Sequence, residues 1–108
     1  MDKTIAKLSP LTESTFYVLL AVQKPIHGYG IIKIIEELTD GRIVLAAGTL
    51  YGALQNLERY NCIELHKSSV SRRKKEYVST ELGTKLLQFE INRLKSMLKH
   101  VEELEGLS

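Results

Sequence analysis

The chain has 108 residues, of which 44% are apolar and 26% charged, and its formal net charge is only +2. These values predict one soluble globular domain with a modest core, and no apolar run approaches the ~20 residues that cross a bilayer. The start of the sequence lacks the apolar stretch of a secretory signal, so we expect a cytoplasmic protein without a membrane partner. The single cysteine, Cys62, excludes an internal disulfide.

The first part of the chain is expected to hold a loose arm over residues 1–8, followed by a helix. Ser9 and Thr12 are candidate N-caps for that helix, and Pro25 ends it, because proline disfavours helical geometry in the residue before it. The run 16–22 is apolar on every face of a helix, which requires cover on more than one side. A second subunit is one source of that cover, and the residues expected to contact it are Phe16, Leu19 and Leu20.

A second helix is expected after the turn at residues 27–28, with inward positions at helical spacing: Ile31, Ile34, Ile35 and Leu38. Residues 39–41 stop this helix, and residues 43–45 are a short strand candidate. A third helix opens at residues 48–49, and Asn61 is suited to end it because asparagine tolerates the left-handed conformation. The buried stripe of the third helix is expected to be Leu50, Leu54 and Leu57.

The outward face of the third helix is small and polar, which suits a helix that enters the major groove of DNA. Gln55 and Asn56 can each make a bidentate pair with adenine, and Arg59 can pair with guanine or a phosphate. The residues predicted to contact DNA from this helix are Thr49, Tyr51, Gly52, Gln55, Asn56 and Arg59.

After the third helix the hydrophobic period changes to two, which predicts a β-hairpin. Ile63 and Leu65 alternate with polar residues, residues 76–79 form the returning strand, and the turn between the strands is polar. Cations in such a tip gain affinity by releasing counterions from DNA phosphates, whereas a charge run by itself is usually a solvated turn. The basic residues of this predicted wing are Lys67, Arg72, Arg73, Lys74 and Lys75.

A long final helix is expected to begin at Thr80 and Glu81, where threonine supplies the N-cap and glutamate a favourable charge. Its apolar residues recur at spacings of four and three, which is a heptad pattern. The preceding eighty residues are too few to cover such a helix, so half of its apolar face needs a partner. The stripe expected to dimerise is Leu87, Ile91, Leu94, Leu98 and Val101.

Three helices and a hairpin in this order predict a winged helix-turn-helix over residues 1–80. Residues 81–108 add the C-terminal dimerisation helix, and the two parts are expected to form one structural unit. The expected fold class is therefore mainly α with a small β-hairpin.

Four stretches of the sequence resemble regulators of the PadR family. They are residues 11–20, the turn at 25–30, the run 47–54, and residues 73–83, which lead from the second wing strand into the last helix. They follow one another in the family's order and at its spacing. The resemblance implies a homodimeric repressor, often of detoxification or transporter genes, that a small effector releases from DNA.

The length resembles that of the short class of the family, whose C-terminal region is a single helix. Some members of that class bind flat aromatic drugs at the dimer centre, stacked on tryptophan, and this sequence has no tryptophan. The residues on the last helix where such a pore would lie, and where the resemblance places an effector, are Phe89, Arg93 and Met97.

The sequence therefore predicts a sequence-specific DNA-binding regulator that acts as a homodimer on a palindromic operator. Its expected partners are double-stranded DNA, a second copy of the chain and a small effector. No nucleophile, base and acid occur at a recognisable spacing, and no ligand cluster suits a metal, so we expect neither an enzyme nor a cofactor. The alternative function is a winged-helix module that binds another protein, with incidental DNA contact.

Overall fold

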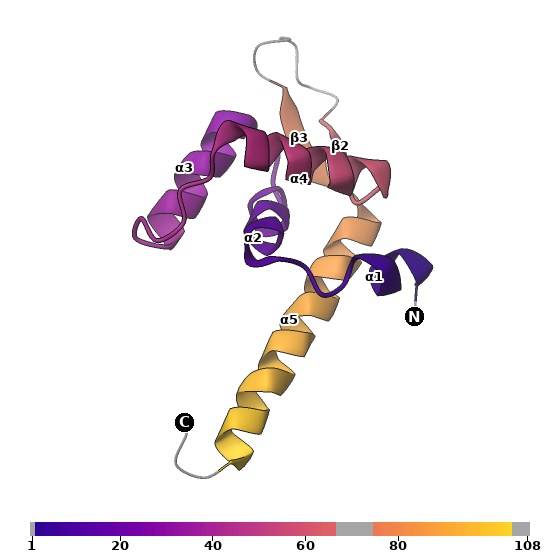
Figure 1. The fold of residues 1–108 in the computed structure, drawn as a ribbon. Coiled ribbons are helices and arrows are strands. Elements are labelled where there is room, and N and C mark those ends of the chain that lie inside the picture. Colours follow the sequence, from indigo (N-terminus) through magenta and orange to yellow (C-terminus); the bar gives the residue numbers. More distant parts are fainter. Residues whose placement is uncertain (1, 67–74, 105–108) are drawn as a thin grey trace.

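The computed structural model describes residues 2–66 and 75–104, which are mainly helical with one small antiparallel sheet (Figure 1). This confirms the predicted fold class, a winged helix-turn-helix followed by a long C-terminal helix. Within these residues, no helix combines the length and apolar character needed to span a bilayer. The elements in chain order are α1 (Lys3–Leu8), α2 (Glu13–Ala21), β1 (Ile26–His27), α3 (Gly28–Leu38), α4 (Ala47–Arg59), β2 (Ile63–Leu65), β3 (Glu76–Ser79) and α5 (Glu81–Glu103).

α2 packs against three other helices, α3, α4 and α5. Thr12 caps it, because its hydroxyl accepts a hydrogen bond from the Thr15 amide at 3.2 Å. The cover that the apolar run requires comes largely from the chain itself, and Leu19 is fully buried. Leu19 is thus a core residue of the single chain, not a free surface for a partner.

The loose arm expected over residues 1–8 is instead the short helix α1. Its N-cap is Asp2, whose Oδ1 accepts a hydrogen bond from the Thr4 amide at 2.7 Å. Ile5 is buried against the core. The prediction of a loose arm was wrong because the packing of Ile5, and in part of Leu8, against the core compensates for the marginal stability of so short a helix.

The sheet has the strand order β1-β3-β2, with both pairs antiparallel. The predicted hairpin is confirmed as β2 and β3, in which Ile63 lies opposite Ser79. The expected strand at residues 43–45 is wrong, because this segment forms no strand and Leu45 turns into the core. The third strand is β1, whose two residues are too few to show a period in the sequence.

α3 buries a narrower stripe than its sequence spacing predicts. Ile31 and Ile35 are fully buried, whereas Ile34 and Leu38 are exposed. Figure 1 shows α3 at the edge of the body, where the rest of the chain does not surround it. The prediction that all four face inward was therefore wrong for the last two.

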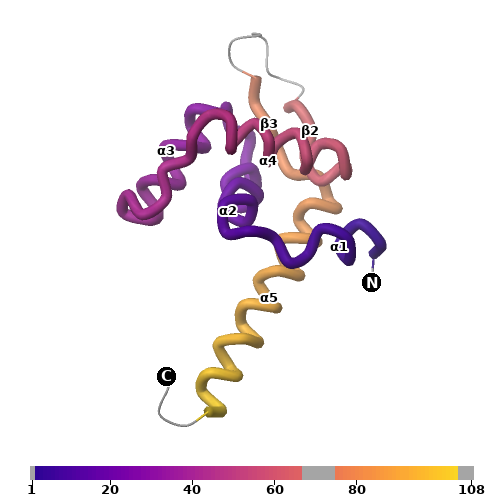
Figure 2. Tube along the Cα trace, in the orientation of Figure 1, coloured from indigo at the N-terminus to yellow at the C-terminus, as the bar shows by residue number. Residues whose placement is uncertain are grey.

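α5 begins inside the body and leaves it about half-way along its length (Figure 2). Thr80 caps it as predicted, its hydroxyl accepting a hydrogen bond from the Gly83 amide at 3.1 Å. Leu86 and Leu87 are buried in the core of the same chain, so Leu87 is also corrected from a dimer contact to a core residue. The helix projects beyond the body, and the molecule measures 54 × 34 × 20 Å.

The last buried residue of α5 is Glu90, which is fully buried although it is acidic. Its carboxylate accepts hydrogen bonds from Ser9, Leu11 and Arg93. Burial by itself raises the pKa of Glu90, but the hydrogen bonds from Arg93, Ser9 and Leu11 and the charge of Arg93 outweigh it. The pKa of Glu90 therefore lies below its ordinary value.

This lowered pKa predicts a pH-dependent contribution of Glu90 to stability. As the pH falls, Glu90 takes up a proton in the unfolded chain at a higher pH than in the folded chain. The stabilisation by Glu90 is therefore complete above the unfolded pKa of about 4.3, and it is lost as the pH falls through the lower pKa of the folded state. We expect E90Q to lower the free energy of unfolding by about 2 kcal/mol at neutral pH, and this difference to shrink towards pH ~3. Urea unfolding at both pH values measures it; an unchanged difference would contradict the prediction.

Candidate nucleic-acid interface

α4 presents the residues that the sequence predicts to contact DNA on its exposed side. Its buried stripe is Leu50, Leu54 and Leu57, as expected. The helix ends at Arg59, and Asn61 follows with a φ of 62°, the left-handed conformation predicted for it. All six predicted reading residues are exposed: Thr49, Tyr51, Gly52, Gln55, Asn56 and Arg59.

The outward surface of α4 is low in relief. A Cβ atom placed on Gly48 or Gly52 would meet no other atom within 4 Å, so both positions open to solvent. Gln55 and Asn56 stand beside this low surface with their amides exposed. A helix with small residues among hydrogen-bonding ones can approach base edges closely.

Tyr51 joins the flank of α4 to the start of α3. A Cβ on Gly28 would lie 2.6 Å from the Tyr51 hydroxyl oxygen, so the close approach depends on glycine at that position. The Tyr51 side chain is nevertheless about half exposed. The phenol is thus packed on one side and open on the other, where its hydroxyl can donate to a phosphate.

Two exposed residues in the first half of α3 were not singled out as contact residues from the sequence. Tyr29 is 67% exposed and stacks on His27, with ring centroids 6.5 Å apart. The Lys33 ammonium lies 5.7 Å from the centroid of the Tyr29 ring. Both residues could have been predicted as DNA contacts from the sequence, because the first helix of a helix-turn-helix crosses the DNA backbone.

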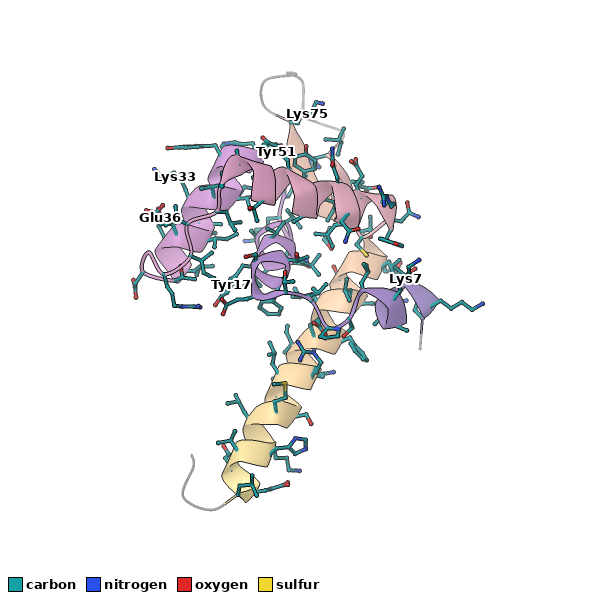
Figure 3. The ribbon with its side chains drawn as sticks, in the orientation of Figure 1. Lys7, Tyr17, Lys33, Glu36, Tyr51 and Lys75 are labelled. Carbon is teal, nitrogen blue, oxygen red and sulfur yellow. The ribbon has the colours of Figure 1, made fainter. Side chains whose placement is uncertain are left out.

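These residues lie towards the same end of the molecule as the wing. Figure 3 shows Lys33, Tyr51 and Lys75 away from the projecting end of α5. Lys75 is exposed just before β3. The other predicted wing cations, Lys67, Arg72, Arg73 and Lys74, lie outside the described residues.

Tyr77 of β3 lies opposite Ile26 of β1 and Leu65 of β2, and its side chain is half-buried. Burial raises the pKa of its phenol, and electrostatic interactions with Tyr51 and Glu58 raise it further. Cys62 is fully buried, and burial also raises the pKa of its thiol, which agrees with a structural role for that residue.

The projecting half of α5 exposes the apolar stripe that was predicted to dimerise. Ile91 is half-buried, whereas Leu94, Leu98 and Val101 are exposed, together with Met97. Of the α2 residues predicted to join them, Phe16 and Leu20 are half-buried.

A hollow of about 430 Å³ lies between α2 and α5. Arg93 and Met97, two of the three residues predicted for an effector site, both line it, whereas Phe89 is not in its lining and packs against the core. The lining residues are Leu11, Glu13, Phe16, Tyr17, Arg93, Leu94 and Met97.

A family model described as the transcriptional regulator PadR-like family matches residues 17–89. The chain belongs to this family. The match runs from α2 to the buried half of α5 and includes the whole of α3 and α4. The PadR-like assignment makes the chain a member of a transcriptional regulator family with a winged helix-turn-helix fold.

Solved structures of transcriptional regulators share the fold over most of their length. A PadR family transcription regulator from Clostridium difficile R20291 superposes with a TM-score of 0.71 at 22% identity, covering 88% of this chain and all (100%) of that one. A transcriptional regulator from Clostridium thermocellum gives 0.71 at 20% identity, with 98% and 99% covered. A PadR family regulator from Eggerthella lenta gives 0.68 at 24% identity, with 87% and 82% covered. Among curated proteins, none matches the chain significantly in sequence.

Proposed function

We propose that this PadR-family chain is a sequence-specific DNA-binding repressor that acts as a homodimer on a palindromic operator. The observation that carries the proposal is the outward face of α4, where open glycines lie beside exposed Gln55 and Asn56. Such a face fits the major groove, and each of the two amides can read an adenine in bidentate fashion.

Residues around α4 supply contacts to the DNA backbone. Lys33 of α3, Tyr51 on the flank of α4 and Lys75 just before β3 are exposed towards the same end of the molecule, and the exposed Tyr29 ring lies near the Lys33 ammonium. Hydroxyls and cations of this kind bind phosphates and orient the protein without reading the sequence. We therefore expect α4 to select the bases and the surrounding residues to supply affinity for the DNA backbone.

The exposed stripe of α5 supports a homodimer. Leu94, Leu98 and Val101 recur at heptad spacing on a helix that projects from its own body. An apolar seam of this period is typical of helices that pair. A two-fold dimer places two α4 helices on one face of a duplex, which predicts half-sites about 34–36 Å apart or a multiple of that distance.

The hollow between α2 and α5 is the proposed effector site. Its volume of about 430 Å³ is in the range of small-molecule pockets. Arg93 and Met97 line it beside the exposed stripe of α5. A ligand bound there would alter the packing at the proposed dimer seam and thereby release the operator.

Selection of duplexes from a random pool, followed by gel-shift titration, tests the proposal directly. A recovered palindrome with a defined half-site spacing is the expected result. Uniform weak binding to every duplex would reject sequence-specific recognition and favour the alternative function as a protein-binding module.

Substitutions on α4 and beside the wing are expected to act differently. Gln55→Ala or Asn56→Ala should relax the base preference at one operator position, costing about 1–3 kcal/mol on the preferred base. Lys75→Ala should weaken binding to all sequences and reduce the salt slope by about one unit if it contacts a phosphate. Titrations at several salt concentrations distinguish the two effects, and identical behaviour of the variants would refute this division of roles.

A further inference from the structure

Glu90 is a buried charge that lies neither on the DNA-facing surface nor in the lining of the proposed effector hollow, although two of its partners, Leu11 and Arg93, line that hollow. It is fully buried, and it is the one buried charged residue in the part of the chain that the structure describes. A buried carboxylate is costly unless it is paired and hydrogen-bonded, and an apolar residue of similar size often stabilises a core better. Its presence therefore calls for a role beyond stability.

The hydrogen bonds of Glu90 fasten the connection between α1 and α2 to α5. One carboxylate oxygen, Oε2, accepts from the Ser9 hydroxyl at 2.6 Å and from Arg93 Nε at 2.9 Å. The other, Oε1, accepts from the Leu11 amide at 2.6 Å and from Arg93 Nη2 at 3.2 Å. Each oxygen is thus held both by the connection and by the next turn of α5.

This clamp sits where α5 leaves the body. Leu86 and Leu87, one turn before it, are buried, whereas all residues from Leu94 to Leu104 are exposed. Figure 1 shows the α1–α2 connection crossing α5 at about this level. Hydrogen bonds are directional, so these four bonds constrain the orientation of the α1–α2 connection relative to α5 at the point where the helix emerges.

The angle matters because the free part of α5 is long. From Glu90 to Glu103 the helix extends for ~20 Å at ~1.5 Å per residue. A tilt of about 10° at Glu90 would move its end by ~3 Å, close to the ~3.4 Å rise of one base pair. Two such tilts in a symmetric dimer would shift the α4 helices relative to each other on DNA.

We propose that Glu90 is a positioning residue: its carboxylate sets the angle between α5 and the winged-helix body, and with it the half-site spacing that the dimer accepts. The link to spacing rests on the proposed function, since it needs both the dimer and the operator. The angle itself is a property of the single chain and is tested separately.

The angle is measured by double electron–electron resonance between one spin label on α4 and one on the free part of α5. Labels at Glu58→Cys and Lys99→Cys, with Cys62→Ala to remove the native thiol, are diluted with unlabelled protein so that only distances within one chain are recorded. The native Glu90 protein should give one narrow distance distribution. E90Q should broaden or shift the distribution by several ångströms, because the neutral amide cannot accept all four hydrogen bonds.

Glu102→Gln is the matched control, since it removes the same charge from the exposed end of α5. It should leave the distance distribution unchanged. If E90Q does not fold, Ser9→Ala removes one donor and leaves the carboxylate, and it should shift or broaden the distribution in the same sense to a smaller extent. A distribution that neither variant changes would overturn the proposal.

Spacing selectivity is measured with duplexes that carry the selected half-sites separated by the preferred spacer or by one or two base pairs more or fewer. The wild type should prefer one spacing at least tenfold, and E90Q should reduce that preference to threefold or less. Equal loss of affinity at every spacing would mean that Glu90 only stabilises the fold. Failure of the wild type to bind any duplex would refute the proposed function, whereas the distance measurement would still decide whether Glu90 sets the angle.

Discussion

Replacing Leu98 with glutamate is expected to convert the proposed dimer into monomers and to lower operator affinity at least ~100-fold, the scale of the avidity that linked half-sites provide. Leu98 is 66% exposed in the single chain, so the substitution leaves the core of the body intact. In the proposed two-fold dimer it would place two like charges in an apolar seam. Light scattering measures the mass, and gel shift measures the affinity for the selected operator.

Ser96→Glu is the matched control for this substitution. Ser96 is exposed and lies on the opposite side of α5 from Leu94 and Leu98 by helical spacing. It adds the same charge to the same helix and should leave mass and affinity unchanged. An L98E protein that remains a dimer would show that the copies associate through another surface.

Adding one methyl group at two different glycines is expected to change stability in opposite directions. A Cβ on Gly83, in the first turn of α5, would collide with the backbone oxygen of Cys62 and with the Ser79 hydroxyl. The backbone oxygen cannot move aside without shifting the turn before β2, and overpacking of this kind costs about 3 kcal/mol or more. For a domain of this size Gly83→Ala should lower Tm by about 12 °C or more.

Gly52→Ala is the opposite case. Gly52 lies within α4, and a Cβ there would meet nothing within 4 Å. Alanine is favoured over glycine inside a helix by about 0.5–1 kcal/mol, so the variant should melt a few degrees higher. Thermal unfolding followed by circular dichroism measures both. A tolerated Gly83→Ala would show that α5 does not approach β2 as closely as the structure indicates.

Local patterns in the sequence were sufficient for most of the winged helix. The caps at Thr12 and Thr80 and the apolar spacing of α4 were predictable because they depend on hydrogen bonds and contacts within a few residues. The exposed polar face of α4 followed from the same spacing. The wing strands were predictable from their period of two.

Other features depend on contacts between distant segments. β1 pairs with a strand about fifty residues later, and its two residues carry no period of their own. α1 is anchored by one buried isoleucine, Ile5, whose burial is decided by the core it meets. Ile34 and Leu38 match an inward spacing but are exposed. Spacing indicates which residues share a helix face, but not how much of that face the rest of the chain covers.

The sequence by itself determined the polar face of α4 and the apolar stripe of α5, because helical periodicity places such residues on one side whatever surrounds them. Only the tertiary structure decided where the apolar stripe of α5 leaves the core of its own chain and becomes exposed. It buries Leu19 and Leu87 within the chain and exposes α5 from Leu94 onwards. The boundary between the buried and the exposed part of α5 lies at Glu90. Its partners Ser9 and Leu11 are 81 and 79 residues away in the sequence, so no local pattern indicates the contact.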